Sequence, residues 1–191
     1  MKLTFSNILN SLSRLKMVAL CLALTFPVSA AHAQDRLSAQ PGGADAIARF
    51  LMNFGRFIDW PETAFNGTDE FRVCVMGENH LGRSLDRTLG SRSVGDRTFN
   101  VIEIGGSDVA QARTCQIVFI SSSEGSRVGE ITSALNGTPV LTVGELADFP
   151  ESGGMIGFSA GRGNDIAMRM HSALISESGL NVREQLHRAI R

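Results

Sequence analysis

The sequence has very little lysine. Its two lysines, Lys2 and Lys16, both lie near the start of the chain. Three of the 18 lysine and arginine residues precede Gln34, so the rest of the chain carries 15 of them against 19 acidic residues. Nucleic-acid-binding domains usually carry a basic excess concentrated on one face. The charge balance therefore gives no indication of a nucleic-acid partner.

The sequence also lacks an apolar run long enough to cross a membrane. Its most apolar run, Met17–Phe26, is about half the length that a transmembrane helix needs. Basic residues precede this run, and Ala31–Ala33 (AHA), shortly after it, fits the small-residue pattern of a cleavage site. We therefore expect residues 1–33 to be a secretory signal peptide, cut near Ala33. The alternative is an anchor that stays attached.

Cysteine is scarce, because only Cys74 and Cys115 remain after residues 1–33. In an oxidising compartment these two are candidates for one disulfide, and two buried free thiols are the alternative. Outside the signal there is no repeat, linker or low-complexity tract. We therefore expect a polar, flexible leader at 34–43 and a single domain at 44–191.

Apolar periodicity predicts strands and helices that alternate along most of the domain. Apolar residues recur at helical spacing over 44–60, and Pro61 ends that helix. Strands are predicted at 71–76, 98–104, 116–120 and 139–143, of which 116–120 is buried, and a hairpin at 154–158 and 165–170. This alternation predicts an α/β three-layer sandwich, with a mainly parallel sheet, helices on both faces and an antiparallel C-terminal portion.

One segment is similar to a phosphate-binding loop. Gly77–Ser84 (GENHLGRS) matches G-x-x-x-x-G-K-S except that Arg83 replaces the lysine. The later strand QIVFI runs into serines rather than into a magnesium-binding aspartate. We therefore interpret Gly77–Ser84 as a glycine-bounded turn between a strand and a helix.

A second segment is similar to the nucleophile elbow of hydrolases. Gly157–Gly161 (GFSAG) places Ser159 at the nucleophile position, and Asp165 and then His171 or His187 follow in the hydrolase order. The elbow needs a helix directly after the serine, whereas the residues that follow here favour a turn. Hydrolysis through Ser159 is therefore only a second alternative, and we do not expect an enzyme.

Metal binding is not expected either. His80, His171 and His187 have no second histidine or free cysteine at ligand spacing, so the sequence predicts neither a metal nor a cofactor. A small-ligand sensor is the first alternative function. Glycine-rich and serine-rich turns at Gly77 and at Ser121–Ser126 follow predicted parallel strands, and such strand ends are where α/β folds bind ligands.

Segments in a fixed order along the domain resemble the YfiR (HmsC-like) family of periplasmic proteins. They are Phe57–Pro61 (FIDWP), Phe71–Gly77 (FRVCVMG), Cys115–Ser121 (CQIVFIS), Leu141–Val143 (LTV), Gly153–Phe158 (GGMIGF) and the C-terminal positions Gly179, Leu180 and Leu186. The resemblance covers about Ala44 to Arg191. It departs from the family pattern at Met170–Ser172, where an I-N-L segment is usual, and in lacking a second cysteine pair near Glu145 and Ser152.

The resemblance implies a periplasmic repressor. Such proteins bind the periplasmic sensor domain of an inner-membrane diguanylate cyclase and lower cyclic-di-GMP and biofilm formation. An OmpA-like outer-membrane lipoprotein can sequester the repressor, and homodimers occur. The resemblance also implies that Cys74 and Cys115 form a disulfide.

The surface that binds the partner is predicted only from side-chain type. Met155, Phe158, Met168 and Met170 are apolar residues in or beside the predicted C-terminal hairpin. Methionine suits adaptable interfaces, so these four are our candidate partner-binding residues. The alternative is that all four belong to the core.

Overall fold

The computed structural model describes residues 36–189 except 107, 147 and 162–164. All of these residues belong to one compact unit, residues 33–191. The predicted signal peptide lies outside the described residues. No helix within the described part of the chain is both long enough and apolar enough to cross a bilayer.

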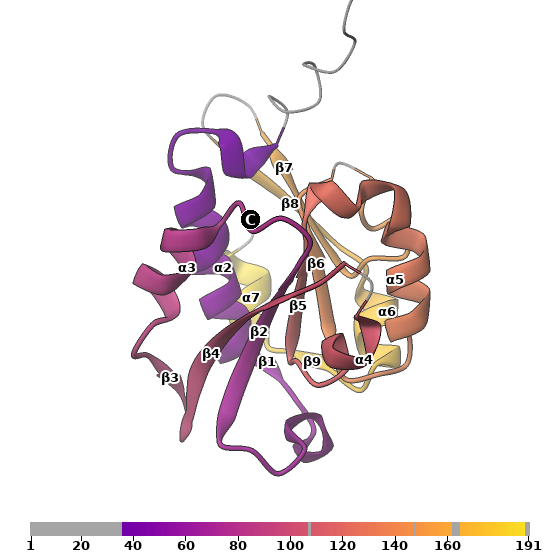
Figure 1. The fold of residues 1–191 in the computed structure, drawn as a ribbon. Coiled ribbons are helices and arrows are strands. Elements are labelled where there is room, and N and C mark those ends of the chain that lie inside the picture. The colour runs from indigo at the N-terminus through magenta and orange to yellow at the C-terminus, as the bar shows by residue number, and fades with distance from the viewer. Residues whose placement is uncertain (1–35, 107, 147, 162–164, 190–191) are drawn as a thin grey trace, which may run out of the picture. The chain divides into compact units, whose positions relative to one another are not determined.

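A mixed sheet of seven strands forms the centre of the unit (Figure 1). The strand order is β3-β4-β2-β5-β6-β7-β8. The strands are β2 (Glu70–Met76), β3 (Ser93–Val94), β4 (Arg97–Ile104), β5 (Ile117–Ile120), β6 (Leu141–Gly144), β7 (Ile156–Ala160) and β8 (Ile166–Met170). The five inner strands are parallel, and the edge strands β3 and β8 are antiparallel to their neighbours. The predicted parallel sheet with an antiparallel C-terminal portion is therefore confirmed.

Helices cover both faces of the sheet, as the three-layer prediction requires. Side chains alternate between faces along a strand, so Val73 and Val75 face one core while Cys74 and Met76 face the other. The first core also takes side chains from α2 (Gly43–Phe57), α3 (Gly82–Leu89), α6 (Ser172–Glu177) and α7 (Glu184–Ala189). The second takes them from α4 (Val109–Ala112) and α5 (Val128–Leu135).

The first long helix, α2, ends earlier than the sequence predicts. Ile58–Asp59 form the short strand β1, which pairs antiparallel with β9 (Asn181–Val182), whereas the apolar pattern extended the helix to Trp60.

Near the start of α2, hydrogen bonds from Ser84 and Arg87 of α3 lower the pKa of Asp45 below its ordinary value. The Arg87–Asp45 ion pair measures 2.6 Å and ties the two helices together.

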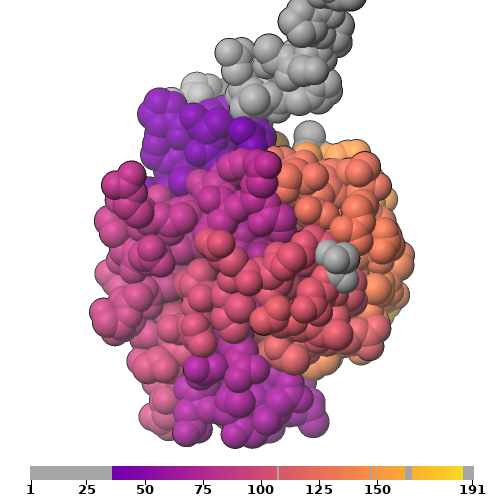
Figure 2. All heavy atoms as spheres, in the orientation of Figure 1, coloured from indigo at the N-terminus to yellow at the C-terminus, as the bar shows by residue number. Residues whose placement is uncertain are grey.

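Part of the segment predicted as a flexible leader is packed against the domain. Leu37–Ala39 form a short 3-10 helix, η1, and Leu37 is 2% exposed in the first core. The backbone N–H of Ser38 donates to Glu145 Oε2 at 2.9 Å. The indigo spheres of η1 and the start of α2 lie together in Figure 2. The burial of one apolar side chain therefore holds this end of the segment.

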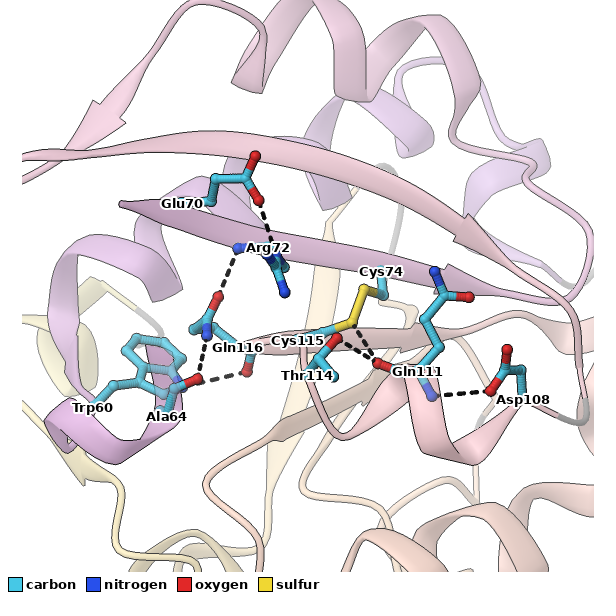
Figure 3. The surroundings of a disulfide bond; sticks show 10 residues. All are labelled: Trp60, Ala64, Glu70, Arg72, Cys74, Asp108, Gln111, Thr114, Cys115 and Gln116. Atoms are coloured by element: carbon cyan, nitrogen blue, oxygen red, sulfur yellow. Dashed lines mark hydrogen bonds and ion pairs between the residues drawn. A yellow bond between two sulfur atoms is a disulfide. The ribbon is translucent and has the colours of Figure 1, made fainter. Parts of the chain in front are cut away.

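The junction between β2 and β5 is fixed by a disulfide and a buried amide (Figure 3). Cys74 and Cys115 form a disulfide with their Cα atoms 6.1 Å apart. Next to it, Gln116 is 1% exposed. Its Oε1 accepts a bond from the Arg72 N–H and its Nε2 donates to the Ala64 carbonyl, both at 2.6 Å. This one side chain joins both strands to the 3-10 helix η2 (Glu62–Phe65).

Trp60 closes the same junction from the side. Its indole N–H donates to the Gln116 carbonyl at 3.3 Å, and its ring meets Phe71 edge-on with centroids 4.9 Å apart. Trp60 is half-buried, and its indole gains from having one such acceptor while the rest of the ring packs on apolar neighbours. The FIDWP and CQIVFIS segments therefore meet in space, although more than 50 residues separate them in sequence.

We predict that the disulfide contributes about 4 kcal/mol to the free energy of unfolding, because it closes a long loop in the unfolded chain. The Cys74→Ala/Cys115→Ala double variant should lose about this amount in urea titrations. The native protein should behave in the same way under reducing conditions. Equal stability of the oxidised and reduced native protein would contradict the prediction.

We also predict that Gln116→Leu lowers the free energy of unfolding by about 2–4 kcal/mol, because it strands the buried Arg72 N–H and Ala64 carbonyl without partners. The matched control is Gln111→Leu at an exposed position, which should change stability by about 0.5 kcal/mol or less. Urea denaturation measures both. Similar losses in the two variants would show that the buried amide has no special role.

Candidate protein-binding edge

Strand β8 leaves one side of the sheet open. It pairs with β7 on its inner side, and within the described residues no strand pairs with its outer side. The ladder is bonded at Gly161–Asp165 and again at Met155–His171. Because bonded pairs alternate along an antiparallel ladder, the N–H and C=O groups of Ile166, Met168 and Met170 point outward.

The side chains of β8 alternate between half-buried and exposed. Ile166, Met168 and Met170 are half-buried and pack against the first core. Ala167 and Arg169 are exposed on the opposite face, where Arg169 forms an ion pair with Glu151. The edge therefore offers outward backbone groups beside partly covered apolar side chains, which is the combination that an added strand uses.

Three surface hollows border this strand. The largest, about 550 Å³, is lined by residues that include Glu151, Met170 and His171. A second, of about 370 Å³, lies between α2 and Ile166 and includes Phe50. A third, of about 240 Å³, continues past Ile166 toward Leu37. Surface hollows therefore lie beside the open edge strand at both of its ends, near Met170 and near Ile166.

The opposite edge of the sheet differs in length. Strand β3 has two residues, Ser93 and Val94, and offers little backbone for pairing. Very short edge strands are one of the ways in which natural sheets avoid unwanted pairing. Strand β8 has five residues with an unbroken register to β7 and contains no proline. The protection found at β3 is therefore missing at β8.

Two of the four predicted partner-binding residues are buried. Phe158 is 0% exposed and Met155 is 4% exposed, so neither offers surface to a partner in this structure. Phe158 lies under α2, where its ring stacks on Phe54 at 6.1 Å and contacts Phe50 at 5.2 Å. For this pair, the structure agrees with the alternative that they are core. Met168 and Met170 are the two that reach the surface.

Ala167 and Arg169 face solvent between the methionines but were not among the predicted site residues. The signal was present in IAMRM, where large apolar side chains alternate with Ala167 and Arg169, because a strand with one open face alternates whereas a strand covered on both faces does not. Strand β7 provides the contrast, since Ile156, Gly157 and Phe158 are all buried.

The two turns predicted for a small ligand do come together. They follow β2 and β5, which adjoin in the sheet although the chain visits β4 between them. The Ser121 N–H donates to the Met76 carbonyl at 3.0 Å, and the Glu78 N–H to Ser123 Oγ at 2.9 Å. Such a reversal of strand order is the usual ligand position in open α/β sheets.

In this structure residues 36–38 lie across that position. Arg36 Nη1 is 2.5 Å from His80 Nε2, and Ser38 binds Glu145. Glu145 is 4% exposed, and its Oε1 has no hydrogen-bond partner among the described residues. The buried Arg36 Nε and Ser38 Oγ share this condition. The carboxyl ends of these strands therefore carry polar groups that a bound molecule or water would satisfy.

The segment resembling a phosphate loop is a turn, as interpreted from the sequence. Residues 77–81 join β2 to α3, and residues 82–84 begin that helix. Asn79 Oδ1 accepts bonds from the backbone N–H groups of Leu81 and Gly82, so the amides at the start of α3 are engaged. A phosphate would need these amides itself. Arg83, in place of the lysine, is exposed.

The segment resembling a nucleophile elbow is part of a hairpin. Ser159 lies within β7 and pairs with Ala167 of β8, so no helix follows it directly. His171 is the cap residue of α6, with Nδ1 accepting from the Leu174 N–H at 3.4 Å. The His187 side chain lies outside the described part of the structure. In the described part of the chain, no three His, Cys, Asp or Glu side chains are grouped to hold a metal.

A family model described as YfiR/HmsC-like matches residues 44–189. No curated protein matches the chain. Members of this family are periplasmic, non-catalytic regulators that act in cyclic-di-GMP signalling.

Proposed function

The chain belongs to the YfiR/HmsC-like family, and from that premise we propose that it represses a membrane-bound diguanylate cyclase. It binds the periplasmic sensor domain of that enzyme in the inner membrane. Binding lowers cyclic-di-GMP synthesis and, through it, biofilm formation. The protein acts by contact and has no reaction of its own.

Two observations support a periplasmic location. The family is periplasmic, and the Cys74–Cys115 disulfide fits an oxidising compartment. The proposed export route is the signal peptide at 1–33, removed near Ala33. Both cysteines are buried, at 0% and 1% exposure, which suits a structural bridge better than a reactive thiol.

The open edge of β8 is the observation that carries the proposed contact. Ile166, Met168 and Met170 present outward backbone groups and partly covered apolar side chains, with hollows at both ends of the strand. We assign Met168 and Met170 to the contact with the cyclase. Backbone pairing supplies affinity in such a contact, and the side chains supply selectivity.

Repression follows from unequal binding to two states of the sensor domain. If the repressor binds the inactive state more tightly, it shifts the population toward that state by the ratio of the two affinities. An OmpA-like outer-membrane lipoprotein that removes the repressor would release the cyclase. No chemical step is required of the repressor.

We predict that deletion of this protein raises cellular cyclic-di-GMP, and that the purified protein captures a diguanylate cyclase from solubilised membranes.

Met168→Arg should abolish capture, because a charged side chain replaces an apolar one at the edge. Met52→Arg is the matched control, since Met52 is also half-buried but lies on α2. Mass spectrometry identifies the captured proteins, and a nucleotide assay measures cellular cyclic-di-GMP.

Thermal unfolding of both arginine variants checks that each is folded. An unchanged cyclic-di-GMP level after deletion would contradict repression. Equal loss of capture in Met168→Arg and Met52→Arg would contradict the assignment to β8 but leave repression standing.

A second candidate function is a small-ligand sensor at the carboxyl ends of β2, β5 and β6. The observation that favours it is the buried Glu145 with one unbonded oxygen, beneath Ser38. We predict that a ligand able to donate a hydrogen bond to Glu145 raises the melting temperature. A thermal-shift screen of metabolites tests this, and Glu145→Gln should abolish a true hit. A screen without any stabilising compound would contradict it.

A further inference from the structure

We propose that Met168 and Met170 form a site of reversible oxidation at the open edge of the sheet. Both lie on β8, two residues apart and therefore on the same half-buried face of the strand. Conversion of their thioethers to sulfoxides weakens the contact that this edge makes with a partner. The oxidation site rests on burial and chemistry alone, whereas the weakened contact rests on the proposed function.

Methionine is the form of sulfur that is open to oxidation in this domain. Within the described residues both cysteines, Cys74 and Cys115, are joined in the disulfide and are buried, so neither offers a thiolate. A thioether needs no deprotonation, and a two-electron oxidant converts it directly to the sulfoxide. Access to each methionine sulfur therefore decides where oxidation begins.

The methionines of the domain differ in their access to solvent. Met76 and Met155 are 0% and 4% exposed, so an oxidant in solution does not reach them while the protein is folded. Met168 and Met170 are half-buried, and Met170 also lines the hollow of about 550 Å³ beside β8. An oxidant can therefore reach the two methionines of the open edge before it reaches those of the interior.

The partial burial of these two side chains makes their oxidation consequential. Met168 and Met170 pack against the first core, and in the ladder they lie opposite Phe158 and Ile156, which are both 0% exposed. The oxygen of a sulfoxide is a hydrogen-bond acceptor that such apolar neighbours cannot satisfy. It must therefore turn toward the solvent at the edge, where a partner strand would lie. A partner that covers the oxidised edge would bury an unpaired polar group.

The oxidant in this proposal is hydrogen peroxide, which transfers one oxygen atom to the thioether. A lone pair of the methionine sulfur forms the new S–O bond, and the O–O bond breaks. The second oxygen leaves as water with both hydrogens, so the sulfur loses two electrons to the peroxide. Methionine sulfoxide reductases reverse the change with a thiol reductant, one enzyme for each sulfoxide epimer, and the oxygen then leaves as water.

The first test measures oxidation at each methionine of the folded, purified protein. Cleavage after arginine places Met52, Met76, Met155, Met168 and Met170 on five different peptides, which are 50–56, 73–83, 128–162, 163–169 and 170–183. After limited treatment with hydrogen peroxide, the last two peptides should each gain the mass of one oxygen atom. The peptides of the two buried methionines should remain unmodified. Mass spectrometry of the digest gives all five values in one measurement.

The second test compares capture of the cyclase from solubilised membranes before and after the treatment, once the peroxide is removed. The amount of native protein needed for half-maximal capture should rise at least about five-fold, because the contact now buries an unpaired polar group. In the Met168→Leu/Met170→Leu double variant the same treatment should not change this amount, whatever its starting value, because leucine has no sulfur. Incubation with the reductases should restore the native protein, and the thiol reductant alone should not.

Met52→Leu is the matched control for the double variant. Met52 is half-buried as well, but it lies on α2, where its sulfur accepts from Arg92 Nη1 at 3.6 Å. The peroxide should therefore weaken capture by Met52→Leu as much as capture by the native protein. Protection by Met52→Leu equal to that of the double variant would overturn the assignment to β8.

Each remaining outcome also decides a separate part of the proposal. Oxidation of Met155 as fast as that of Met168 would overturn the site. Unchanged capture by native protein that is oxidised at both edge methionines would overturn the weakened contact. Loss of the cooperative thermal transition on oxidation would overturn it too, since the effect would then be general unfolding. Absence of capture by untreated native protein would contradict the proposed function, and the peptide masses alone would then decide the oxidation site.

Discussion

The fold depends on the junction between β2 and β5, which the chain reaches only after passing through α3, β4 and α4. The two strands adjoin at the centre of the sheet, although their cysteines are 41 residues apart in sequence. The disulfide limits how far they can part in the unfolded chain, and Gln116 supplies the backbone of Arg72 and Ala64 with partners. The parallel backbone pairing of β2 with β5 is therefore reinforced by a covalent bond and by a buried amide.

The same junction determines where the turns at the carboxyl ends of β2 and β5 lie. Because β2 and β5 adjoin, the turns at Gly77 and Ser121 meet, and the leader can bridge them through Arg36. The two turns meet so closely that a side chain does not fit at Gly77, because a Cβ there would lie 2.5 Å from Ser123 Oγ. Glycine also has the backbone freedom that the φ of 89° there requires. The polar cluster around Glu145 is thus a consequence of strand order.

Sequence pattern predicts the elements of this protein better than their order. The runs IVFI in β5 and VCVM in β2 are apolar throughout, which is what strands covered on both faces require, and the predicted bounds of α5 match the structure. Strand order was not predictable, because it depends on contacts between segments far apart in sequence. The strands β1, β3 and β9 have only two residues each, too few to show a period.

The four residues predicted to bind a partner divide into two that are buried and two that reach the surface. Methionine and phenylalanine are equally suited to a core and to an interface, so residue type alone could not separate Met155 and Phe158 from Met168 and Met170. Packing decides the matter. Phe149 fills the space on the other face of β7, where a Cβ on Gly154 would lie 2.1 Å from its ring. Strand β7 is therefore covered on both faces, and the alternating strand beside it is the one left open. The GGMIGF segment that carries the family resemblance includes the glycine that makes room for this ring, just as FIDWP and CQIVFIS build the junction of β2 and β5. The residues that identify the family thus maintain the scaffold, whereas the exposed residues of β8 that would select a partner lie outside those segments.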